Sequence, residues 1–216
     1  MNYAQKRARL VEYLCATAIK SREVKEAFLS VAREEFVPRE ARQYAYDDNA
    51  VPIWKGQTIS QPSTIAIMLE LLEAREGMKA LEVGSGCGYV LALLAKIVGP
   101  EGRAFGTEII GELAEKSAES LARAGIGNAE VRLCDGAEGW KENAPFDRIL
   151  LSCACPFIPK ELFSQLAEGG RIVAPVGDEA SQMMEVLAKN GGRPLKKTLE
   201  TEIFMFVPMK GKHGFK

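Results

Sequence analysis

Three acidic residues lie at the ends of successive apolar segments, and their spacing points most directly to chemistry. Glu82 lies within the segment KALEV, Glu108 follows RAFGT, and Asp135 follows VRLC. If these segments are parallel strands, their carboxyl ends meet at one edge of a sheet, where open α/β sheets bind their ligands. A single acid in a loop carries little information, but three at consecutive strand ends predict a binding rim.

A glycine-rich turn, GSGCG at residues 84–88, follows the first of these segments. Glycine lets the backbone turn tightly and approach a ligand closely. The fingerprint for a dinucleotide pyrophosphate, G-x-G-x-x-G, needs glycine at position 89, where the sequence has Tyr89. Glu82 also suits a positively charged ligand better than a pyrophosphate. The turn therefore disfavours a nucleotide-binding oxidoreductase, which stays open as an alternative.

The other two acids indicate an adenosine-like ligand. Glu108 stands about twenty residues beyond the glycine turn, where an acid can accept hydrogen bonds from both ribose hydroxyls. Asp135, followed by Gly136, could accept a hydrogen bond from an adenine amino group. The rim therefore predicts a nucleoside site with a place for a cation.

The polar stretch QTISQP at residues 57–62 precedes an apolar helical pattern over residues 65–72. Its Ser60 has two interpretations. From spacing alone, Ser60 is a helix N-cap with Pro62 in the first turn. Alternatively, Ser60 belongs to an active site. The two roles are compatible, because the N-terminus of a helix also favours an anion.

The elements that must position these residues follow from periodicity. Residues 4–36 predict two helices, with Ser21 as the N-cap of the second, and residues 37–62 form a long irregular stretch. From residue 79 onward, strands alternate with helices, which predicts right-handed βαβ units and an α/β, doubly wound, mostly parallel sheet. The expected strands are 79–83, 104–107, 129–133, 148–151 and 171–176, and the expected helices are 65–72, 89–98, 110–124 and 159–166.

The last third of the chain lacks intervening helices. Residues 183–187 and 202–208, on either side of a Gly191-Gly192 turn, predict antiparallel strands at one edge of the sheet. We expect a single domain. Residues 1–62 give its N-terminal helices and a loop beside the site, 63–177 its α/β core, and 178–216 its antiparallel strands and tail. We interpret the basic tail KGKHGFK as solvated rather than as a binding site.

Composition sets limits on function. The 28 Lys and Arg residues nearly balance the 29 Asp and Glu residues, so we expect neither a nucleic-acid nor a membrane surface. Five cysteines without a CxxC pair favour a reducing compartment, and we expect a cytoplasmic protein. The single histidine, His213, excludes a multi-histidine metal site and leaves little scope for Ser/His/Asp or Cys/His catalysis.

The glycine turn and the acids Glu108 and Asp135 resemble the cofactor site of class I S-adenosylmethionine-dependent methyltransferases. Longer motifs are similar to one family of that class, the protein-L-isoaspartate (D-aspartate) O-methyltransferases. The similarity covers roughly residues 24–210, and QTISQP is specific to that family rather than to methyltransferases at large. The matching motifs are FVP (36–38), YDDNAVPI (46–53), GQTISQP (56–62), CDGAEGW (134–140), PFDRI (145–149), IP (158–159), GGRIVAPVG (169–177) and FVP (206–208).

The resemblance implies transfer of a methyl group from S-adenosyl-L-methionine to the free α-carboxylate of L-isoaspartyl residues in damaged proteins and peptides, with S-adenosyl-L-homocysteine as the product. The methyl ester can close to a succinimide, whose hydrolysis returns some normal aspartate. A carboxylate is already ionised at neutral pH and needs no general base. The alternatives are a methyltransferase of this fold that acts on a small molecule or RNA, and a non-enzymatic binding module.

The resemblance also implies the roles of individual residues. Ser60 corresponds to the serine that is named as catalytic in the family, and it either holds the substrate carboxylate or positions its loop. We expect a monomer without a metal. The implied substrate-binding residues are Gln57, Thr58, Ile59, Ser60 and Gln61. The implied cofactor-binding residues are Thr58, Ile59, Glu82, Gly84, Ser85, Gly86, Gly88, Glu108, Ile109, Asp135, Gly136 and Ala137.

Three segments depart from the pattern of the family and leave the substrate preference open. Trp54-Lys55 stands in a loop that is often built of small residues, and Ser63-Thr64 stands where many members carry a larger residue. Ser152-Cys153-Ala154-Cys155 replaces a run that is usually rich in alanine.

Overall fold

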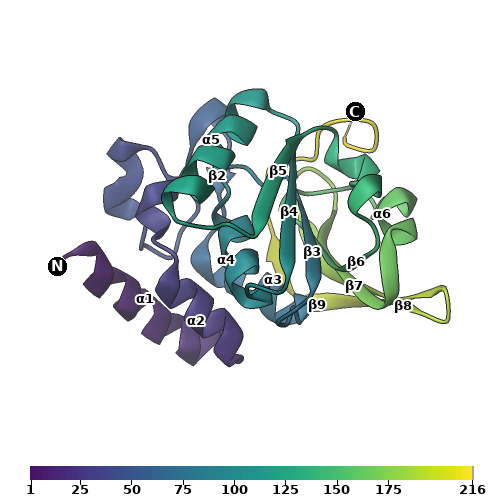
Figure 1. Cartoon of the computed structure of the whole chain (residues 1–216), viewed down its shortest axis with the longest axis horizontal. Helices are drawn as coiled ribbons and strands as arrows, with labels where there is room; N and C mark the ends of the chain where they lie inside the picture. The colour runs from purple at the N-terminus through teal and green to yellow at the C-terminus, as the bar shows by residue number, and fades with distance from the viewer. Residues whose placement is uncertain (216) are drawn as a thin grey trace.

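A seven-stranded sheet runs through the molecule in the order β5-β4-β3-β6-β7-β8-β9, and a short two-stranded ribbon, β1-β2, lies apart from it. The computed structural model describes residues 1–215, without the side chains of residues 200 and 201. Figure 1 shows the sheet between helices α1 to α5 on one side and α6 on the other. The strands are β1 (Val51–Pro52), β2 (Thr58–Ile59), β3 (Lys79–Val83), β4 (Arg103–Glu108), β5 (Ala129–Leu133), β6 (Phe146–Leu151), β7 (Leu166–Gly177), β8 (Gln182–Asn190) and β9 (Arg193–Phe204).

Strands β3 to β7 are mutually parallel, while β8 and β9 are antiparallel to their neighbours. The predicted doubly wound sheet with an antiparallel C-terminal edge is thus confirmed. The strand order reverses at β3, which has β4 on one side and β6 on the other. Such a switch point opens a crevice at the carboxyl ends of the strands, and the glycine turn after β3 lies beside it.

Alternating side chains divide the interior into two cores, one on each face of the sheet. Leu150 and Val173 pack on the face covered by α1 to α5, whereas Ile149 and Ile172 pack on the face covered by α6. The helices are α1 (Tyr3–Thr17), α2 (Arg22–Ser30), α3 (Pro62–Leu72), α4 (Tyr89–Val98), α5 (Gly111–Arg123) and α6 (Lys160–Ser164), with 3-10 turns η1 (Arg33–Phe36), η2 (Arg39–Tyr44), η3 (Trp54–Gly56), η4 (Gly136–Glu138) and η5 (Lys141–Asn143).

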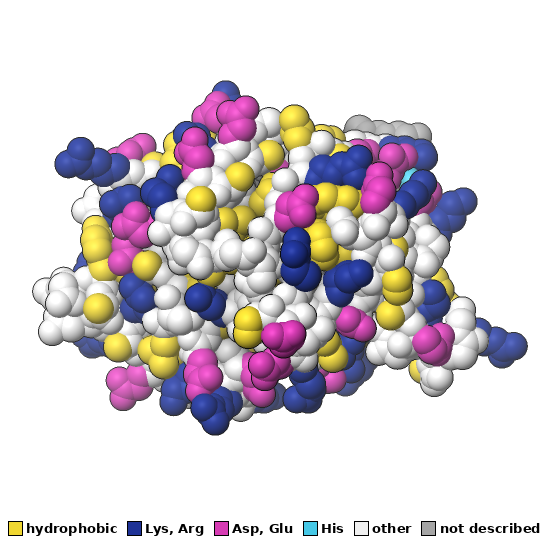
Figure 2. Space-filling view, viewed as in Figure 1, with side chains coloured by type: hydrophobic (Ala, Val, Ile, Leu, Met, Phe, Trp, Pro, Cys, Tyr) yellow, Lys and Arg dark blue, Asp and Glu magenta, His cyan; other side chains and the backbone are white. Residues whose placement is uncertain are grey.

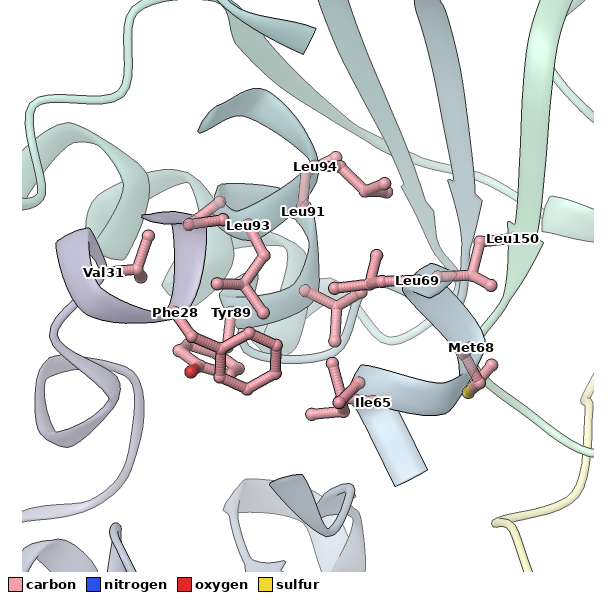
Figure 3. Packing of buried hydrophobic residues seen from close by; sticks show 14 of the residues in the cluster. Phe28, Val31, Ile65, Met68, Leu69, Tyr89, Leu91, Leu93, Leu94 and Leu150 are labelled. Atoms are coloured by element: carbon pink, nitrogen blue, oxygen red, sulfur yellow. The ribbon is translucent and has the colours of Figure 1, made fainter. Parts of the chain in front are cut away.

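Helix α4 is apolar almost all round, and every residue of it except Lys96 is buried. A helix of this kind must be covered on all sides, and the sheet, α2 and α5 cover it. In Figure 3, Phe28 of α2, Ile65 of α3 and Leu93 of α4 point into one packed interior. This packing fixes the position of α4 and, with it, the glycine turn at its N-terminus.

Several predicted elements have different bounds in the structure. The fifth parallel strand begins at Leu166 rather than at residue 171, because Leu166 already pairs with Phe146 of β6. The second N-terminal helix ends at Ser30 rather than near residue 36, because the backbone becomes extended at Val31 (φ −95°, ψ 121°), and η1 then follows as a separate turn. The last strand is Arg193–Phe204 rather than 202–208. The Gly191-Gly192 turn, with φ values of 58° and 73°, sets Arg193 opposite Asn190, so pairing begins at once.

Charged side chains of both signs are interspersed on the face of the molecule in Figure 2, as the balanced composition indicates. Within residues 1–215, no helix has the length and apolar character that crossing a bilayer requires. The C-terminal residues return to the strand ends near α6 (Figure 1).

Candidate active site

The crevice at the switch point collects most of the predicted site residues. It is walled by the glycine turn, by residues 57–58, by the start of η4, and by residues 207–210 near the C-terminus. The predicted residues that line it are Gln57, Thr58, Gly84, Gly86, Glu108, Ile109, Gly136 and Ala137. A smaller adjoining cleft is lined by Thr58, Ile59, Ser60, Glu82, Gly84, Ser85 and Gly86, among others.

Glu108 ties the glycine turn to the start of α5. Its Oε2 accepts the amide proton of Gly86 at an N–O distance of 2.8 Å, and its Oε1 accepts that of Ile110 at 2.9 Å. The positive φ values of Gly84 (78°) and Gly86 (52°) allow this turn. Each carboxylate oxygen retains a further lone pair, so Glu108 can still accept two hydroxyl donors from a ligand.

Glu82 is a buried acid, with only 1% of its surface exposed. Ser152, just beyond β6, donates its hydroxyl proton to Glu82 Oε1 at 2.6 Å, across the switch point. The other oxygen, Oε2, has no hydrogen-bond partner among the described residues. Burial raises the pKa of Glu82 to about 8, and the negative charge of Glu108 adds to the rise. A buried carboxyl group with an unpaired oxygen is suited to a cationic ligand group.

Asp135 is not among the residues that line the two clefts, although Gly136 and Ala137, which follow it, line the main crevice. Both of its carboxylate oxygens already accept a backbone amide proton. Oδ1 accepts the amide proton of Ala137 at 3.0 Å, and Oδ2 accepts that of Lys212 at 2.8 Å. Gly211, with a φ of 103°, brings its Cα so close to the same carboxylate that a Cβ atom would collide with it. Asp135 therefore binds the C-terminal segment of this chain, while one lone pair on each oxygen remains for a ligand.

The C-terminal tail is exposed at residues 210–212, as predicted, but it is also held against the rest of the chain. Lys212 Nζ lies 3.2 Å from Glu138 Oε1, and His213 Nε2 lies 3.2 Å from Glu161 Oε1. Acids of η4 and α6 thus attract the basic tail, and residues 209–210 line the main crevice. The sequence shows the tail's charge but not its partners, because these partners lie far away along the chain.

Gly88 has a packing role in the structure. It lies immediately before α4 with a φ of 86°, and a Cβ atom there would collide with Ser117 of α5. Its missing side chain lets α4 and α5 approach closely. This contact is a reason for glycine at position 88 that is separate from the predicted contact with a cofactor.

Residues 58–60 separate three clefts. Thr58 lines the main crevice, the smaller cleft beside Glu82, and a groove beside residues 203–207. Ser60 lines the latter two, and Gln61 lines the groove. The predicted substrate residues therefore stand between the glycine turn and a second groove.

The interpretation of Ser60 as a helix cap is wrong. The N-cap residue of α3 is Gln61, which makes no capping bond, and Pro62 occupies the first turn as predicted. The side chain that caps this helix comes from further back. Asp48 Oδ1 accepts the amide proton of Ser63 at 2.8 Å, and its Oδ2 accepts a side-chain proton of Gln61 at 3.1 Å. The Ser60 hydroxyl is thus not used in capping.

Trp54 and Lys55, one of the departures from the family pattern, fasten the loop to α5. Lys55 Nζ lies 2.7 Å from Glu112 Oε2, and Lys116 Nζ lies 4.6 Å from the centroid of the Trp54 ring. Lys55 has a left-handed backbone (φ 58°). The loop between β1 and β2 therefore reaches from the substrate side of the crevice to the helix that follows Glu108.

Sequence reasoning missed several residues of the site. Ser152 appears in the sequence only as a departure from the family pattern. Its place directly after the fourth parallel strand nevertheless follows the same rule that identified the three acids. No local signal marks Asp48 as the cap of α3 or residues 207–210 as a wall, because each acts through a contact with a distant part of the chain.

Comparison with known proteins agrees with this geometry. The family model described as "Protein-L-isoaspartate(D-aspartate) O-methyltransferase (PCMT)" matches residues 5–214. A protein from Archaeoglobus fulgidus named "Protein-L-isoaspartate O-methyltransferase 2" is 45% identical over 216 residues, which cover 100% of this chain and 98% of that protein. A "Protein-L-isoaspartate O-methyltransferase" from Methanothrix thermoacetophila is 45% identical over 196 residues, or 91% of each chain.

Two solved structures are similar over nearly all of this chain. A "protein-L-isoaspartate O-methyltransferase" superposes with a TM-score of 0.87 at 28% identity, over 96% of this chain and 67% of the other. A putative enzyme of the same name from Plasmodium falciparum, in complex with S-adenosyl-L-homocysteine, superposes with a TM-score of 0.82 at 25% identity, over 97% and 99% of the two chains. The chain belongs to the protein-L-isoaspartate(D-aspartate) O-methyltransferase family.

Proposed function

We propose that this chain transfers the methyl group of S-adenosyl-L-methionine to the α-carboxylate of L-isoaspartyl residues in damaged proteins. The observation that carries the proposal is the position of Thr58 and Ser60. They line both the cleft at the glycine turn and the groove beside residues 203–207. A methyl donor held at the glycine turn and an acceptor held in the groove would meet at these residues.

The residues at the glycine turn fit this cofactor. Glu108 keeps lone pairs for the ribose hydroxyls, and the unpaired Oε2 of Glu82 suits a cationic group. When bound, S-adenosyl-L-methionine supplies a methyl group that its positively charged sulfur activates for transfer. We propose that the remaining contacts come from Thr58, Ile59, Gly84, Ser85, Gly86, Gly88, Ile109, Asp135, Gly136 and Ala137.

The chain's task toward the acceptor is to orient it. A substrate carboxylate is ionised at neutral pH, so no residue has to remove a proton from it. Small hydroxyl and amide groups can hold a carboxylate by hydrogen bonds without neutralising it, and Gln57, Thr58, Ser60 and Gln61 are of this kind. Correct orientation of two reactants supplies roughly 7–11 kcal/mol of a barrier. We propose that Ser60 holds the substrate carboxylate, with Ile59 as its apolar neighbour.

The methyl ester makes the α-carbonyl carbon a better electrophile. The backbone nitrogen of the following residue can then attack it, which expels methanol and closes a succinimide. Hydrolysis of this ring returns some normal aspartate, and the overall sequence is a repair. We further propose that the enzyme acts as a monomer in the cytoplasm on isoaspartyl-containing proteins and peptides, without binding nucleic acid or membrane. The near balance of charges and the free cysteines support this.

Initial rates of methyl transfer to two forms of one peptide test the function. The isoaspartyl form should accept methyl groups and the aspartyl form should not, because only the former has a free α-carboxylate, whereas in the aspartyl form the α-carboxyl group forms the peptide bond. A chain that binds S-adenosyl-L-homocysteine yet methylates neither peptide would instead be a methyltransferase for a small molecule or RNA.

A further inference from the structure

Arg33, the first residue of η1, is fully buried, with 0% of its surface exposed. Its Nη2 donates to the main-chain oxygen of Ser60 at 2.8 Å. Its Nε and Nη1 have no hydrogen-bond partner among the described residues. No acid of the described part of the chain forms an ion pair with it. An arginine remains charged inside a protein, so a buried positive charge lies directly behind the loop that carries Ser60.

The neighbouring acid does not neutralise this charge. Glu34 lies next to Arg33 in the sequence, but its carboxylate accepts the hydroxyl proton of Tyr46 and lies 3.6 Å from Arg7 Nη2. Burial lowers the pKa of Arg33, which reflects the cost of placing a cation in an apolar interior. A buried charge without a partner destabilises the folded protein. This cost indicates a functional role for Arg33 beside Ser60.

An aromatic ring holds the guanidinium in place. Arg33 Cζ lies 4.9 Å from the centroid of the Tyr89 ring, a distance typical of a cation–π contact. Tyr89 is the first residue of α4, and its ring packs edge-on against Phe28 and Phe36. Phe28 and Tyr89 lie against each other in Figure 3. Because Tyr89 follows the glycine turn, Arg33 links the Ser60 loop to the cofactor side of the site.

We propose that Arg33 is a positioning residue that fixes the backbone of Ser60 and supplies the positive charge that favours a carboxylate over a neutral group at that loop. Ser60 and Tyr89 both line the small cleft beside Glu82, so the two residues that Arg33 contacts border the site. This inference rests on the proposed function, because it concerns the anionic group that the enzyme methylates. It explains how a site that needs no base still selects an ionised acceptor.

Arg33 acts on the substrate in two ways. Its hydrogen bond fixes the position of Ser60, and its positive charge favours a negatively charged group at that loop. A charge in a water-poor interior interacts over several ångströms far more strongly than one in water. No carboxylate of the described chain pairs with the guanidinium, so its field is not cancelled locally. We expect a contribution of roughly tenfold to the preference for an anionic over a neutral ligand.

The test compares two ligands that differ in one charge. One is an isoaspartyl peptide, and the other is the same peptide with its α-carboxylate replaced by a neutral carboxamide. Their dissociation constants are measured by calorimetry on enzyme loaded with S-adenosyl-L-homocysteine, which prevents turnover. Arg33→Met should reduce the preference for the carboxylate about tenfold, while affinity for the carboxamide changes by no more than about twofold. Equal losses for both peptides would mean a structural role only and would overturn the proposal.

Three further variants separate charge from hydrogen bonding and from folding. Arg33→Gln keeps a donor for the Ser60 oxygen but lacks the charge, so its preference should also fall, and it carries the test if Arg33→Met does not fold. Arg33→Lys should keep most of the preference. Arg42→Met removes a half-exposed charge, paired with Glu35 at 3.1 Å, and should leave the preference unchanged.

Methylation of the isoaspartyl peptide by the wild-type enzyme separates failure of the proposed function from failure of the proposed role of Arg33. If the wild type does not methylate it, the proposed function fails. If the wild type methylates it and Arg33→Gln retains the full preference for the carboxylate, the function stands and the role of Arg33 fails.

Discussion

The two walls of the crevice are built in different ways. The cofactor wall consists of the glycine turn (84–88) with Glu82 and Glu108, and it is made of the ends of adjacent parallel strands. The loop wall consists of residues 53–61, and side chains from elsewhere hold it in place. Arg33 bonds Ser60 from 27 residues away, and Lys55 reaches Glu112 of α5.

This difference separates what the fold provides from what individual contacts provide. Once β3, β4 and β6 pair, the backbone of the cofactor wall is set. Glu108 accepts the amide proton of Gly86 within the turn, and Glu82 accepts the hydroxyl proton of Ser152 beyond β6. The loop wall has almost no sheet of its own, since β1 and β2 pair through two residues each. Its position therefore depends on the burial of Ile53 and Ile59 and on single hydrogen bonds and ion pairs, and substitutions in the two walls should act on different steps.

The largest effect should come from the buried acid of the cofactor wall. Burial raises the pKa of Glu82 from 4.5 in the unfolded chain to about 8 in the folded one. The folded protein therefore holds the proton more tightly, and the stability that this gives is complete below pH 4.5 and is lost as the pH rises through 8. Glu82→Gln cannot ionise and should become more stable than the wild type by up to about 5 kcal/mol over this window.

Urea unfolding of both proteins at several pH values between 4.5 and 8.5 measures this difference. Asp178→Asn is the matched control, since this exposed carboxyl has a pKa below its usual value. A difference between Glu82→Gln and the wild type that does not change with pH would contradict the account.

The second effect concerns Glu108, for which we propose a contact with the ribose hydroxyls of the cofactor. Glu108→Ala removes both the acceptor for ligand hydroxyls and the bonds to Gly86 and Ile110. Affinity for S-adenosyl-L-homocysteine should fall about 100-fold, since each bond to a charged group contributes roughly 1.5–3 kcal/mol. Calorimetry measures it. Affinity within a few-fold of the wild type would show that the cofactor wall does not depend on this acid.

A third comparison separates the proposed role of Ser60 in the loop wall from the helix cap that Asp48 provides for α3. Ser60→Ala should lower kcat/KM for an isoaspartyl peptide about 30-fold, as the loss of one well-placed hydrogen-bond donor does, without lowering the melting temperature. Asp48→Ala should do the reverse, costing about 1 kcal/mol of stability through the lost cap. Kinetics and thermal unfolding on the two variants decide. If Ser60→Ala is the variant that loses stability and keeps its activity, the assignment is reversed.

The smallest effect should come from the ion pair that joins the loop wall to α5. Lys55 and Glu112 are both about half exposed, so solvent and salt screen their attraction. Lys55→Met should raise KM for the cofactor about twofold at low salt and hardly at all at high salt. Arg22→Met, which breaks an exposed pair on α2, is the control. A KM unchanged at low salt would mean that the loop wall is held without this pair.

The sequence predicted the cofactor wall more completely than the loop wall, for a physical reason. The strands 79–83 and 129–133 have the predicted bounds, because clear turn signals follow both segments. Glu82, Glu108 and Asp135 follow from strand ends, and a parallel sheet brings strand ends together. The ligand roles of these residues stay predictions, but their convergence at one rim is what the structure shows.

The errors concern contacts between distant parts of the chain. Ser60 has the spacing of a cap, yet Asp48 from the preceding loop performs that role. The tail is a basic segment in the sequence, yet the main-chain amide of Lys212 donates to Asp135 from 77 residues away. Nothing in the local sequence identifies these distant partners, so the contacts required the structure.

The most direct test of the central claim follows one isoaspartyl peptide through repair. The wild-type enzyme and S-adenosyl-L-methionine are added to this peptide, and the isoaspartyl, methyl ester, succinimide and aspartyl forms are separated chromatographically over time. The ester should form first, the succinimide should follow, and the aspartyl form should accumulate. If the enzyme binds S-adenosyl-L-homocysteine but the isoaspartyl peptide remains unchanged, the claim is contradicted.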